Sequence, residues 1–318
     1  MSSVKESTCA TIGFFDGVHL GHRFLIEQLK EQARLSGLKS AVVTFRQHPR
    51  QILQSNYQPQ LLSSLDERLQ RLHATGVDYC HVLDFTPELA ATSAKDFIQE
   101  ILHKQLHVKE LLIGHDHRFG KGRTDDFQNY VEYGADCGMN VQLAVTSYQL
   151  PVALRHCGLD PQSPVGSAPV NSTAIRNAII EGNMLIANQM LGYTYALTGK
   201  VIVGDRIGHT IGFPTANLEL AEPLKVLPKE GAYAVRVHPA DGQTNAGMAY
   251  IGRRPSVAQK EELRIEVHLF DFCEDLYGQI LRVEFVDFLR PSAKFPNIVA
   301  LKAQLGEDVL KTKKLLTS

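Results

Sequence analysis

The chain changes its hydrophobic pattern once along its length, and this change limits it to a fold with two domains. In the first half, predicted strands and helices alternate. The apolar runs typical of buried strands cover residues 8–14, 39–45, 78–85, 110–114 and 140–146. Helical spacing of apolar residues covers 21–36, 65–75, 94–106 and 126–137. Strands joined by single helices must cross over and run parallel, so this half predicts a doubly wound α/β sheet.

After residue 192, strand patterns follow one another without helices between them. They cover residues 200–203, 232–238, 246–251, 263–270 and 280–288. This spacing predicts antiparallel strands that close into a small barrel. A terminal helix is predicted over 297–315, where apolar residues share one face: Ile298, Leu301, Leu305, Val309 and Leu310. We therefore expect a first domain over residues 1–184 and a second over residues 185–318.

The stretch from residue 150 to residue 169 fits neither pattern. It contains four prolines and two glycines, which cannot sustain a helix or an interior strand. We interpret it as a long loop and favour a solvated insertion over a lid. Helical spacing returns at 172–181 and continues to about residue 191.

Composition excludes several classes of function. Lys plus Arg (33) and Asp plus Glu (34) nearly cancel, and no long run of like charge occurs, so no nucleic-acid or membrane partner is expected. The first residues lack the apolar core of a signal peptide, and no apolar stretch approaches membrane-spanning length. The five cysteines show no C-x-x-C spacing, which argues against a disulfide framework or structural zinc. We expect a reducing, cytoplasmic location.

A first phosphate-handling pattern is the segment GFFDGVHLGH at residues 13–22, where a strand breaks into a turn and then a helix. A helix N-terminus offers unpaired N–H groups and partial positive charge to an anion. Gly17 permits the turn, and Gly21 is predicted to let a phosphate approach the backbone. His19 and His22 fall on one helix face, where two imidazole donors suit a phosphoryl transition state. Two such histidines alone are usually surface residues, but the whole segment favours a phosphate site.

This segment resembles the signature of H-x-G-H nucleotidylyltransferases, in the form carried by bacterial FAD synthetases. Residues 44–50 (TFRQHPR), 114–123 (GHDHRFGKGR) and 170–176 (VNSTAIR) resemble further motifs of that family. The chain departs from it at Asn171, where serine is usual, and at His117, where phenylalanine is usual. The second departure removes an aromatic face that could stack on flavin.

The resemblance implies roles for individual residues. Ser172, Thr173 and Arg176 would hold the β- and γ-phosphates of ATP, and arginine suits a bidentate phosphate contact. His19 and His22 would be catalytic. The residues implied to bind ATP or its phosphates are Phe15, Asp16, Gly17, Gly21, Asp116, Ser172, Thr173 and Arg176. The candidates for flavin contact are His48, Phe119 and Arg290.

A second pattern begins with Gly204, Gly208 and Gly212, which recur every four residues around a polar loop. The chain has no G-x-x-x-x-G-K-[ST] motif, so a kinase here would not be a P-loop enzyme. Backbone closing over a phosphate chain and a plain glycine-rich hairpin turn explain this spacing about equally.

The neighbouring PTAN at residues 214–217 favours the phosphate loop, because it resembles the P-T-A-N of riboflavin kinases. That resemblance implies ATP binding at Pro214 and the three glycines. It also implies Mg²⁺ held by Thr215 and Asn217, whose hard oxygen donors suit this ion. Glu266 matches the catalytic glutamate, and segments 247–255, 265–272, 276–278 and 288–291 also agree. His209 departs from the family, which often has arginine there.

Together the resemblances imply a bifunctional riboflavin kinase and FMN adenylyltransferase that uses two ATP pockets. One pocket is expected at the carboxyl edge of the sheet and the other inside the barrel. The implied small molecules are riboflavin, FMN, FAD and ATP, with Mg²⁺ as cofactor. Two alternatives remain open: only one of the two activities is live, or the protein is a non-catalytic flavin-binding sensor. Assaying each half-reaction on its own substrate separates the first alternative from the bifunctional interpretation, and tight flavin binding without ATP consumption would support the second. The sequence carries no signal for oligomeric state.

Overall fold

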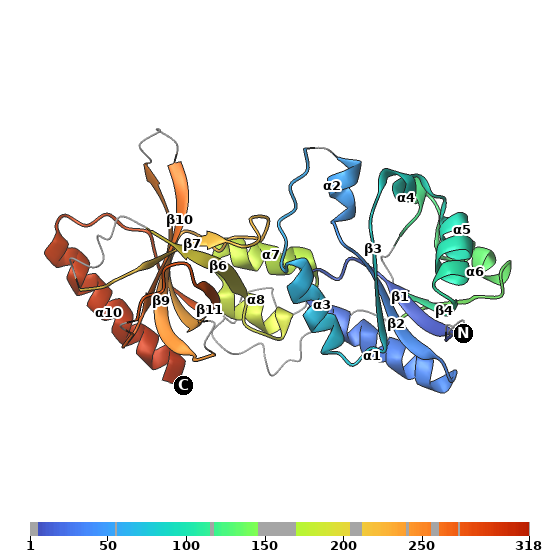
Figure 1. The fold of residues 1–318 in the computed structure, drawn as a ribbon, viewed down its shortest axis with the longest axis horizontal. Coiled ribbons are helices and arrows are strands. Elements are labelled where there is room, and N and C mark those ends of the chain that lie inside the picture. Colours follow the sequence, from blue (N-terminus) through green and yellow to red (C-terminus); the bar gives the residue numbers. More distant parts are fainter. Residues whose placement is uncertain are drawn as a thin grey trace, which may run out of the picture. The chain divides into compact units, whose positions relative to one another are not determined.

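The computed structural model describes residues 6–54, 56–114, 118–145, 170–203, 212–239, 242–255, 261–272 and 274–317. It divides into two compact units, Met1–Ser172 and Thr173–Ser318 (Figure 1). The break lies 12 residues before the predicted boundary, at 172 rather than 184, so the helix that we predicted over 172–181 in the first domain groups with the second unit. The functional boundary after residue 184 stays a prediction. The loop predicted over 150–169 lies outside the described residues.

The first unit is built on a five-stranded parallel sheet in the order β3-β2-β1-β4-β5. Its strands are β1 (Thr8–Ile12), β2 (Lys39–Phe45), β3 (Tyr79–Leu83), β4 (Val108–Ile113) and β5 (Asn140–Leu143). Every neighbouring pair runs parallel, which confirms the doubly wound α/β prediction. The chain order reverses between β1 and β4. Ligands bind at this switch point in open α/β sheets, beyond the carboxyl ends of the strands.

Helices cover both faces of the sheet because neighbouring residues of each strand point to opposite sides. On one face α1 (Leu20–Leu35) and α3 (Leu65–His73) pack against Cys9 and Val42. On the other face the π-helix η2 (Phe97–Gln105), which continues α5 (Ala94–Asp96), and α6 (Phe127–Ala135) pack against Ala10 and Val43. Figure 1 shows these two groups of helices on opposite sides of the strands. The two faces confirm the predicted three-layer arrangement.

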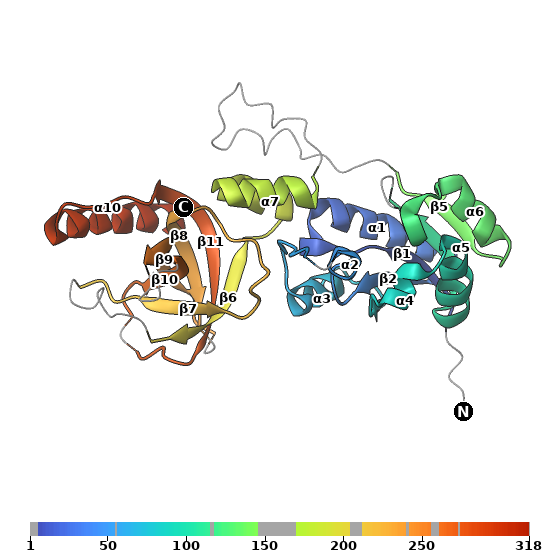
Figure 2. The ribbon, with the colours of Figure 1, turned by 90° about the horizontal axis from the view of Figure 1, so that it is seen from above.

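The second unit is a closed antiparallel barrel with the strand order β10-β7-β6-β11-β8-β9. A terminal helix, α10 (Ile298–Thr317), runs along one side of it (Figure 2). The helices α7 (Ser172–Glu181) and α8 (Met184–Leu191) precede the barrel. The strands are β6 (Ala196–Ile202), β7 (Ala216–Leu220), β8 (Gly231–His238), β9 (Asn245–Pro255), β10 (Glu261–Leu269) and β11 (Ile280–Pro291). This architecture confirms the predicted barrel and terminal helix.

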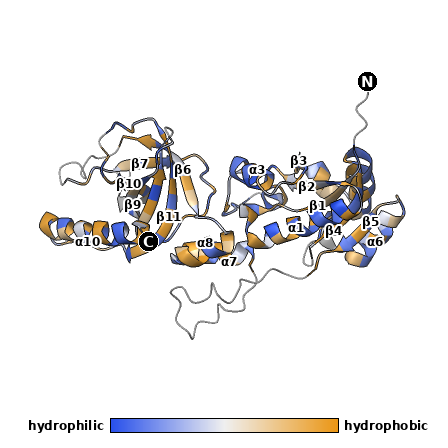
Figure 3. Cartoon of the chain, turned by 90° about the horizontal axis from the view of Figure 1, so that it is seen from below, coloured by the Kyte–Doolittle hydropathy of each residue, from blue (hydrophilic) through white to orange (hydrophobic). Residues whose placement is uncertain are grey.

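Hydrophobic and hydrophilic residues alternate along the surface helices in Figure 3. In α10 the predicted apolar face is only partly buried, since Ile298 and Leu310 are exposed, whereas Asp308 is buried. In α1 the residues Ile26, Leu29 and Ala33 are buried, at helical spacing. Among the described residues, no helix combines the length and the apolar character needed to cross a membrane.

Among the described α-helices and strands, three were not predicted. The helices α2 (Pro49–Leu53) and α4 (Pro87–Ala91) have only five residues each, too few to show a period. Both begin with proline after a capping side chain, His48 and Thr86 respectively, so local capping rather than periodicity defines them. Strand β7 begins within the PTAN segment, which we had interpreted only as a loop.

Candidate active sites

The turn between β1 and α1 is tightly bent. Phe15, Gly17 and Val18 have positive φ values of 56°, 78° and 42°. Glycine accepts this conformation without cost, which supports the predicted role of Gly17 in the turn. Phe15 and Val18 carry strain, and strain of this kind concentrates at functional sites. The strained backbone of this turn therefore coincides with the first predicted site.

A buried carboxylate holds the turn. Asp16 is 3% exposed and accepts hydrogen bonds from the backbone N–H of Leu62 at 3.0 Å and of Ser63 at 3.1 Å. The Gly17 N–H in turn donates to Ser63 Oγ at 2.9 Å. Asp16, predicted to bind nucleotide, therefore fixes the turn against the segment before α3. Its direct contact with ATP stays a prediction.

The two predicted catalytic histidines lie together at the start of α1. His19 is the N-cap residue, and its Nδ1 accepts a hydrogen bond from the backbone N–H of His22 at 3.3 Å. The two rings stack with centroids 3.6 Å apart, and Phe15 meets His22 edge-on at 5.2 Å. Because Nδ1 of His19 is an acceptor, the neutral ring carries its proton on Nε2.

Packing explains why residue 21 is a glycine, and this explanation differs from the predicted one. A Cβ at this position would lie 2.8 Å from the carbonyl oxygen of Val170 and 3.2 Å from the His19 ring. The glycine thus allows two chain segments to meet, whereas close approach of a phosphate there stays a prediction. Next to Val170, the Ser172 hydroxyl donates to the carbonyl of Asp16 at 3.4 Å. The start of the predicted phosphate-binding stretch therefore lies beside the turn.

The other predicted residues of this site are less fully placed. Thr173 and Arg176 stand in the first turns of α7, within the second unit. Asp116 and His117 lie outside the described residues. The roles of these residues stay predictions.

His48, a candidate for flavin contact, belongs to an aromatic row at the end of β2. Its ring meets Phe14 edge-on at 4.7 Å and lies 5.5 Å from the ring of Tyr57. Its Nδ1 accepts from the Arg50 N–H at 3.1 Å as the N-cap of α2. The cap fixes the orientation of the imidazole and leaves Nε2 as the proton-bearing nitrogen of the neutral ring.

Phe119, the second flavin candidate, is engaged in core packing. Its ring stacks on Tyr130 with centroids 4.3 Å apart and lies 5.6 Å from Phe97. Tyr130 also accepts from the Phe119 N–H and donates to its carbonyl. One face of the Phe119 ring is thus taken by protein, and a flavin would have only the other.

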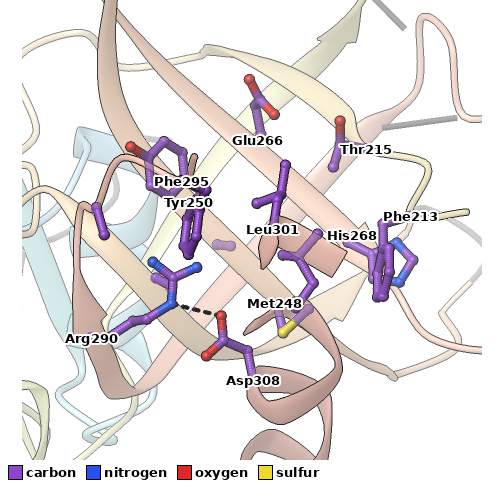
Figure 4. A pocket seen from close by; sticks show the side chains of 14 residues that line it. Phe213, Thr215, Met248, Tyr250, Glu266, His268, Arg290, Phe295, Leu301 and Asp308 are labelled. Carbon is purple, nitrogen blue, oxygen red and sulfur yellow. Dashed lines mark hydrogen bonds and ion pairs between the residues drawn. The ribbon is translucent and has the colours of Figure 1, made fainter. Parts of the chain in front are cut away.

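The second unit holds a cavity of about 290 Å³ between the barrel and α10, which Figure 4 shows from close by. Three of its lining residues, Ala232, Tyr250 and Glu266, belong to one row across the barrel wall that continues to Asn217. Ala232, Tyr250, Glu266 and Asn217 are successive partners across β8, β9, β10 and β7. Their neighbours in the strands, such as Val267, are buried in the barrel interior. The cavity therefore lies against the outer face of the barrel wall, because the strand residues that alternate with its lining fill the barrel interior. The predicted ATP pocket inside the barrel stays a prediction.

Glu266 and the predicted magnesium ligands share this face. Glu266 on β10 is the antiparallel partner of Asn217 on β7, so their side chains point to the same side. Thr215 precedes Asn217 by two residues and lines the cavity with Glu266. The structure thus brings together three oxygen-bearing side chains that lie far apart in the sequence.

The segment that carries Thr215 is held by a histidine that sequence reasoning missed. His268 lines the same cavity, and its Nδ1 lies 2.7 Å from the carbonyl oxygen of Pro214. Since a carbonyl only accepts, Nδ1 of His268 is the donor. The signal was available: His268 follows Glu266 by two residues, so the two share a strand face. Of the predicted glycines, Gly212 has φ 81°, whereas Gly204 and Gly208 lie outside the described residues.

Arg290, the third flavin candidate, lines the cavity opposite Glu266's strand. Its Nε donates to Asp308 of α10 at 2.8 Å, and its guanidinium lies 5.4 Å from the centre of the Phe295 ring. Asp308 is 1% exposed and also accepts from Gln304 at 3.1 Å. This pair anchors α10 over the cavity and keeps one cation in its wall (Figure 4). Sequence reasoning missed Asp308, because a single acid on an amphipathic helix gives no signal of its partner.

The side chains of Thr215 and Asn217 fit a magnesium ion whose other ligands are mostly nucleotide phosphates and water. Among the described residues, no group of three or more His, Cys, Asp and Glu side chains could hold a metal by itself. Thr215 and Asn217 offer a hydroxyl and an amide oxygen, which are hard ligands that Mg²⁺ accepts. Mg²⁺ commonly keeps few protein ligands and completes its shell with phosphates and water.

Two family models match the chain, one on each side of the segment from residue 151 to residue 190. The first, FAD synthetase, matches residues 1–150, and the second, riboflavin kinase, matches residues 191–316. They correspond to the parallel-sheet unit with His19 and His22 and to the barrel with Glu266.

Relatives along the whole chain agree with both models. Bifunctional riboflavin kinase/FMN adenylyltransferases from Escherichia coli K12 and Haemophilus influenzae are 37% and 36% identical, over 96% and 99% of this chain and 92% and 96% of theirs. A crystal structure described as a macrolide-efflux protein from Streptococcus pneumoniae has a TM-score of 0.81 at 30% identity, over 98% of this chain and 97% of that one. That description stays with that protein, whereas both family models and the relatives name flavin enzymes. The chain therefore belongs to the bifunctional riboflavin kinase/FMN adenylyltransferase family.

Proposed function

We propose that the chain makes FAD in two steps, phosphorylating riboflavin to FMN and then transferring AMP from a second ATP to FMN with release of pyrophosphate. The observation that carries this function is the presence of both family models in one chain, in the order and along the length of the bifunctional relatives. The two candidate sites support it, since each unit has its own constellation of groups suited to phosphate chemistry.

In the barrel unit, Glu266 would accept the proton of the riboflavin 5′-hydroxyl as that oxygen attacks the γ-phosphorus of ATP and displaces ADP. Its place in the cavity wall, on the face that carries Thr215 and Asn217, supports this role. Thr215 and Asn217 would hold Mg²⁺, which neutralises phosphate charge when bound. Pro214, Gly212, Gly208 and Gly204 would close over the ATP phosphates.

In the parallel-sheet unit, a phosphate oxygen of FMN would attack the α-phosphorus of ATP and displace pyrophosphate. His19 and His22 would stabilise the charge that develops on the transferring group, without a covalent bond to the enzyme. The N-terminus of α1 adds positive potential at the same place. Ser172, Thr173 and Arg176 would hold the departing phosphates, and His48 and Phe119 would contact flavin.

These reactions involve small, soluble substrates, and we propose that they take place in the cytoplasm. The cysteines that the structure describes, Cys9, Cys80 and Cys137, are free thiols, which supports a reducing compartment.

The experiment that tests the function is incubation with riboflavin, ATP and Mg²⁺, followed by chromatography of the flavins. We expect FMN to appear first and FAD to follow. A second incubation supplies FMN directly and so tests adenylylation alone. If neither riboflavin nor FMN is converted while flavin still binds tightly, the chain is a flavin-binding protein and the proposal is wrong.

A further inference from the structure

Arg68 on α3 is a charged residue buried beneath the first candidate site. It is 1% exposed and is among the largest fully buried side chains of the described chain. Within the described residues it forms no ion pair with a carboxylate. Burial lowers the pKa of Arg68 to about 10, and the charge of Asp16 partly opposes that effect. A buried charge without a carboxylate partner is costly, so its presence calls for a reason.

The contacts of Arg68 join the ends of two neighbouring strands. Its guanidinium carbon lies 4.0 Å from the centre of the Phe14 ring, a cation–π contact just after β1. Its Nη2 donates to the carbonyl of Phe45 and, at 3.4 Å, to that of Arg46, at the end of β2. One planar cation therefore fixes an aromatic ring and two carbonyl groups at the carboxyl edge of the sheet.

The beginning of α3 is itself tied to the β1–α1 turn. Leu62 and Ser63, just before the helix, donate to Asp16. Phe14 links Arg68 to His48, because its ring contacts both side chains. His19 and His22, by contrast, are held by the N-cap of α1. Arg68 is thus linked to the flavin candidate and not directly to the catalytic histidines.

We propose that Arg68 is a positioning residue for FMN in the adenylylation step, acting through Phe14 and the end of β2 on the surface that His48 presents. The inference rests on the proposed function of this unit. Arg68 cannot touch the substrate itself, since its side chain is enclosed. Its loss should weaken FMN binding more than it slows the chemical step.

The test measures kcat and KM for FMN in the full-length protein with Arg68→Met and Arg68→Lys. For Arg68→Met we expect KM for FMN to rise about tenfold, the scale of a desolvated cation–π contact, with kcat changed by less than about twofold. Arg68→Lys keeps the charge but loses the planar guanidinium that stacks on Phe14 and donates to the carbonyls. Its KM for FMN should therefore lie between those of the parent and Arg68→Met. Arg34→Met, at an exposed arginine paired with Glu31, is the matched control and should leave KM unchanged.

Riboflavin phosphorylation by the same preparations reports whether the rest of the chain is intact. A lower melting temperature with unchanged KM for FMN would overturn the inference, because Arg68 would then be merely structural. A loss of kcat at constant KM would also overturn it. If Arg68→Met does not fold, the KM of Arg68→Lys decides. Failure of the parent chain to adenylylate FMN at all would instead overturn the proposed function.

Discussion

The imidazole rings of His19 and His22 stack face to face at the start of α1, with centroids 3.6 Å apart and planes inclined by 17°. His19 precedes the helix in extended conformation, and its Nδ1 accepts from the N–H of His22. The pair therefore forms one rigid unit, in which the position of each ring depends on the other. This arrangement suits two groups that act on one phosphate.

We expect His22→Ala to stop FAD formation while FMN accumulates from riboflavin. Loss of one preorganised donor should lower the rate of adenylylation by about 10²–10³-fold. Flavin products are followed by chromatography after addition of riboflavin and ATP. His73→Ala, at an exposed histidine of α3, serves as control and should form FAD normally. Loss of FMN as well as FAD in the His22 variant would refute independent sites.

Glu266→Ala should have the converse effect. Removal of the proposed base should slow riboflavin phosphorylation by about 10²–10⁴-fold, while supplied FMN is still converted to FAD. Each half-reaction is measured separately on its own substrate. Glu219→Ala removes an exposed carboxylate of neighbouring β7 and should leave both rates unchanged. A variant at Glu266 that makes FMN at the parent rate would show that the base assignment is wrong.

The sequence was sufficient for the architecture because both periodicities are strong. The predicted strand 39–45 coincides with β2, and the helix predicted over 172–181 coincides with α7. Patterns of this kind arise from burial on one face or both, which the chain itself records. The strand β7 escaped prediction, because it has only five residues and begins within a motif whose polar side chains gave the stronger signal.

The side-chain network of the sites could not be predicted, because it depends on pairs brought together by the fold. Asp16 is directed to Leu62 and Ser63, 46 and 47 residues away. Asp308 reaches Arg290 from the terminal helix. No local pattern marks such partners. The position of the cavity on the outer face of the barrel likewise follows from register, since Glu266 and Val267 alternate between outer and inner faces.

The hydrogen bond from His268 to Pro214 predicts a third effect. His268→Phe keeps a ring of similar size but removes the donor to the segment that carries Thr215. We expect the concentration of Mg²⁺ needed for half-maximal riboflavin phosphorylation to rise about tenfold, as for other residues that orient metal ligands. Titration of Mg²⁺ at saturating ATP measures this value.

The variant His268→Asn tests whether the donor or the ring matters. The Asn side-chain NH₂ can replace the Nδ1–H, so this variant should recover most of the Mg²⁺ response. Adenylylation of supplied FMN should be unaffected in both variants. Equal Mg²⁺ requirements in the parent and His268→Phe would show that the hydrogen bond to Pro214 does not position Thr215 for Mg²⁺.

Glu284 on β11 gives the barrel a dependence on pH. Burial raises the pKa of this carboxyl, but the Arg282 guanidinium and His238, 3.2 Å away, together lower it below its ordinary value of 4.5. A carboxyl whose folded pKa is depressed stabilises the fold above its unfolded pKa and loses that contribution as the pH falls through the folded value. We therefore expect Glu284→Gln to destabilise the barrel at pH 7, by at most about 1 kcal/mol because the group is partly exposed.

Hydrogen exchange of peptides from β8 and β11, corrected for intrinsic rates, measures this difference between the parent and Glu284→Gln. The difference in stability between the parent and the variant should be largest at pH 7. It should disappear as the pH falls below 4.5, where the parent carboxyl becomes protonated. Glu31→Gln breaks an exposed pair with Arg34 in the other unit and should not change exchange in these strands. An equally large difference in stability at pH 3 would mean that the shape of the Glu284 side chain, not its charge, stabilises the barrel.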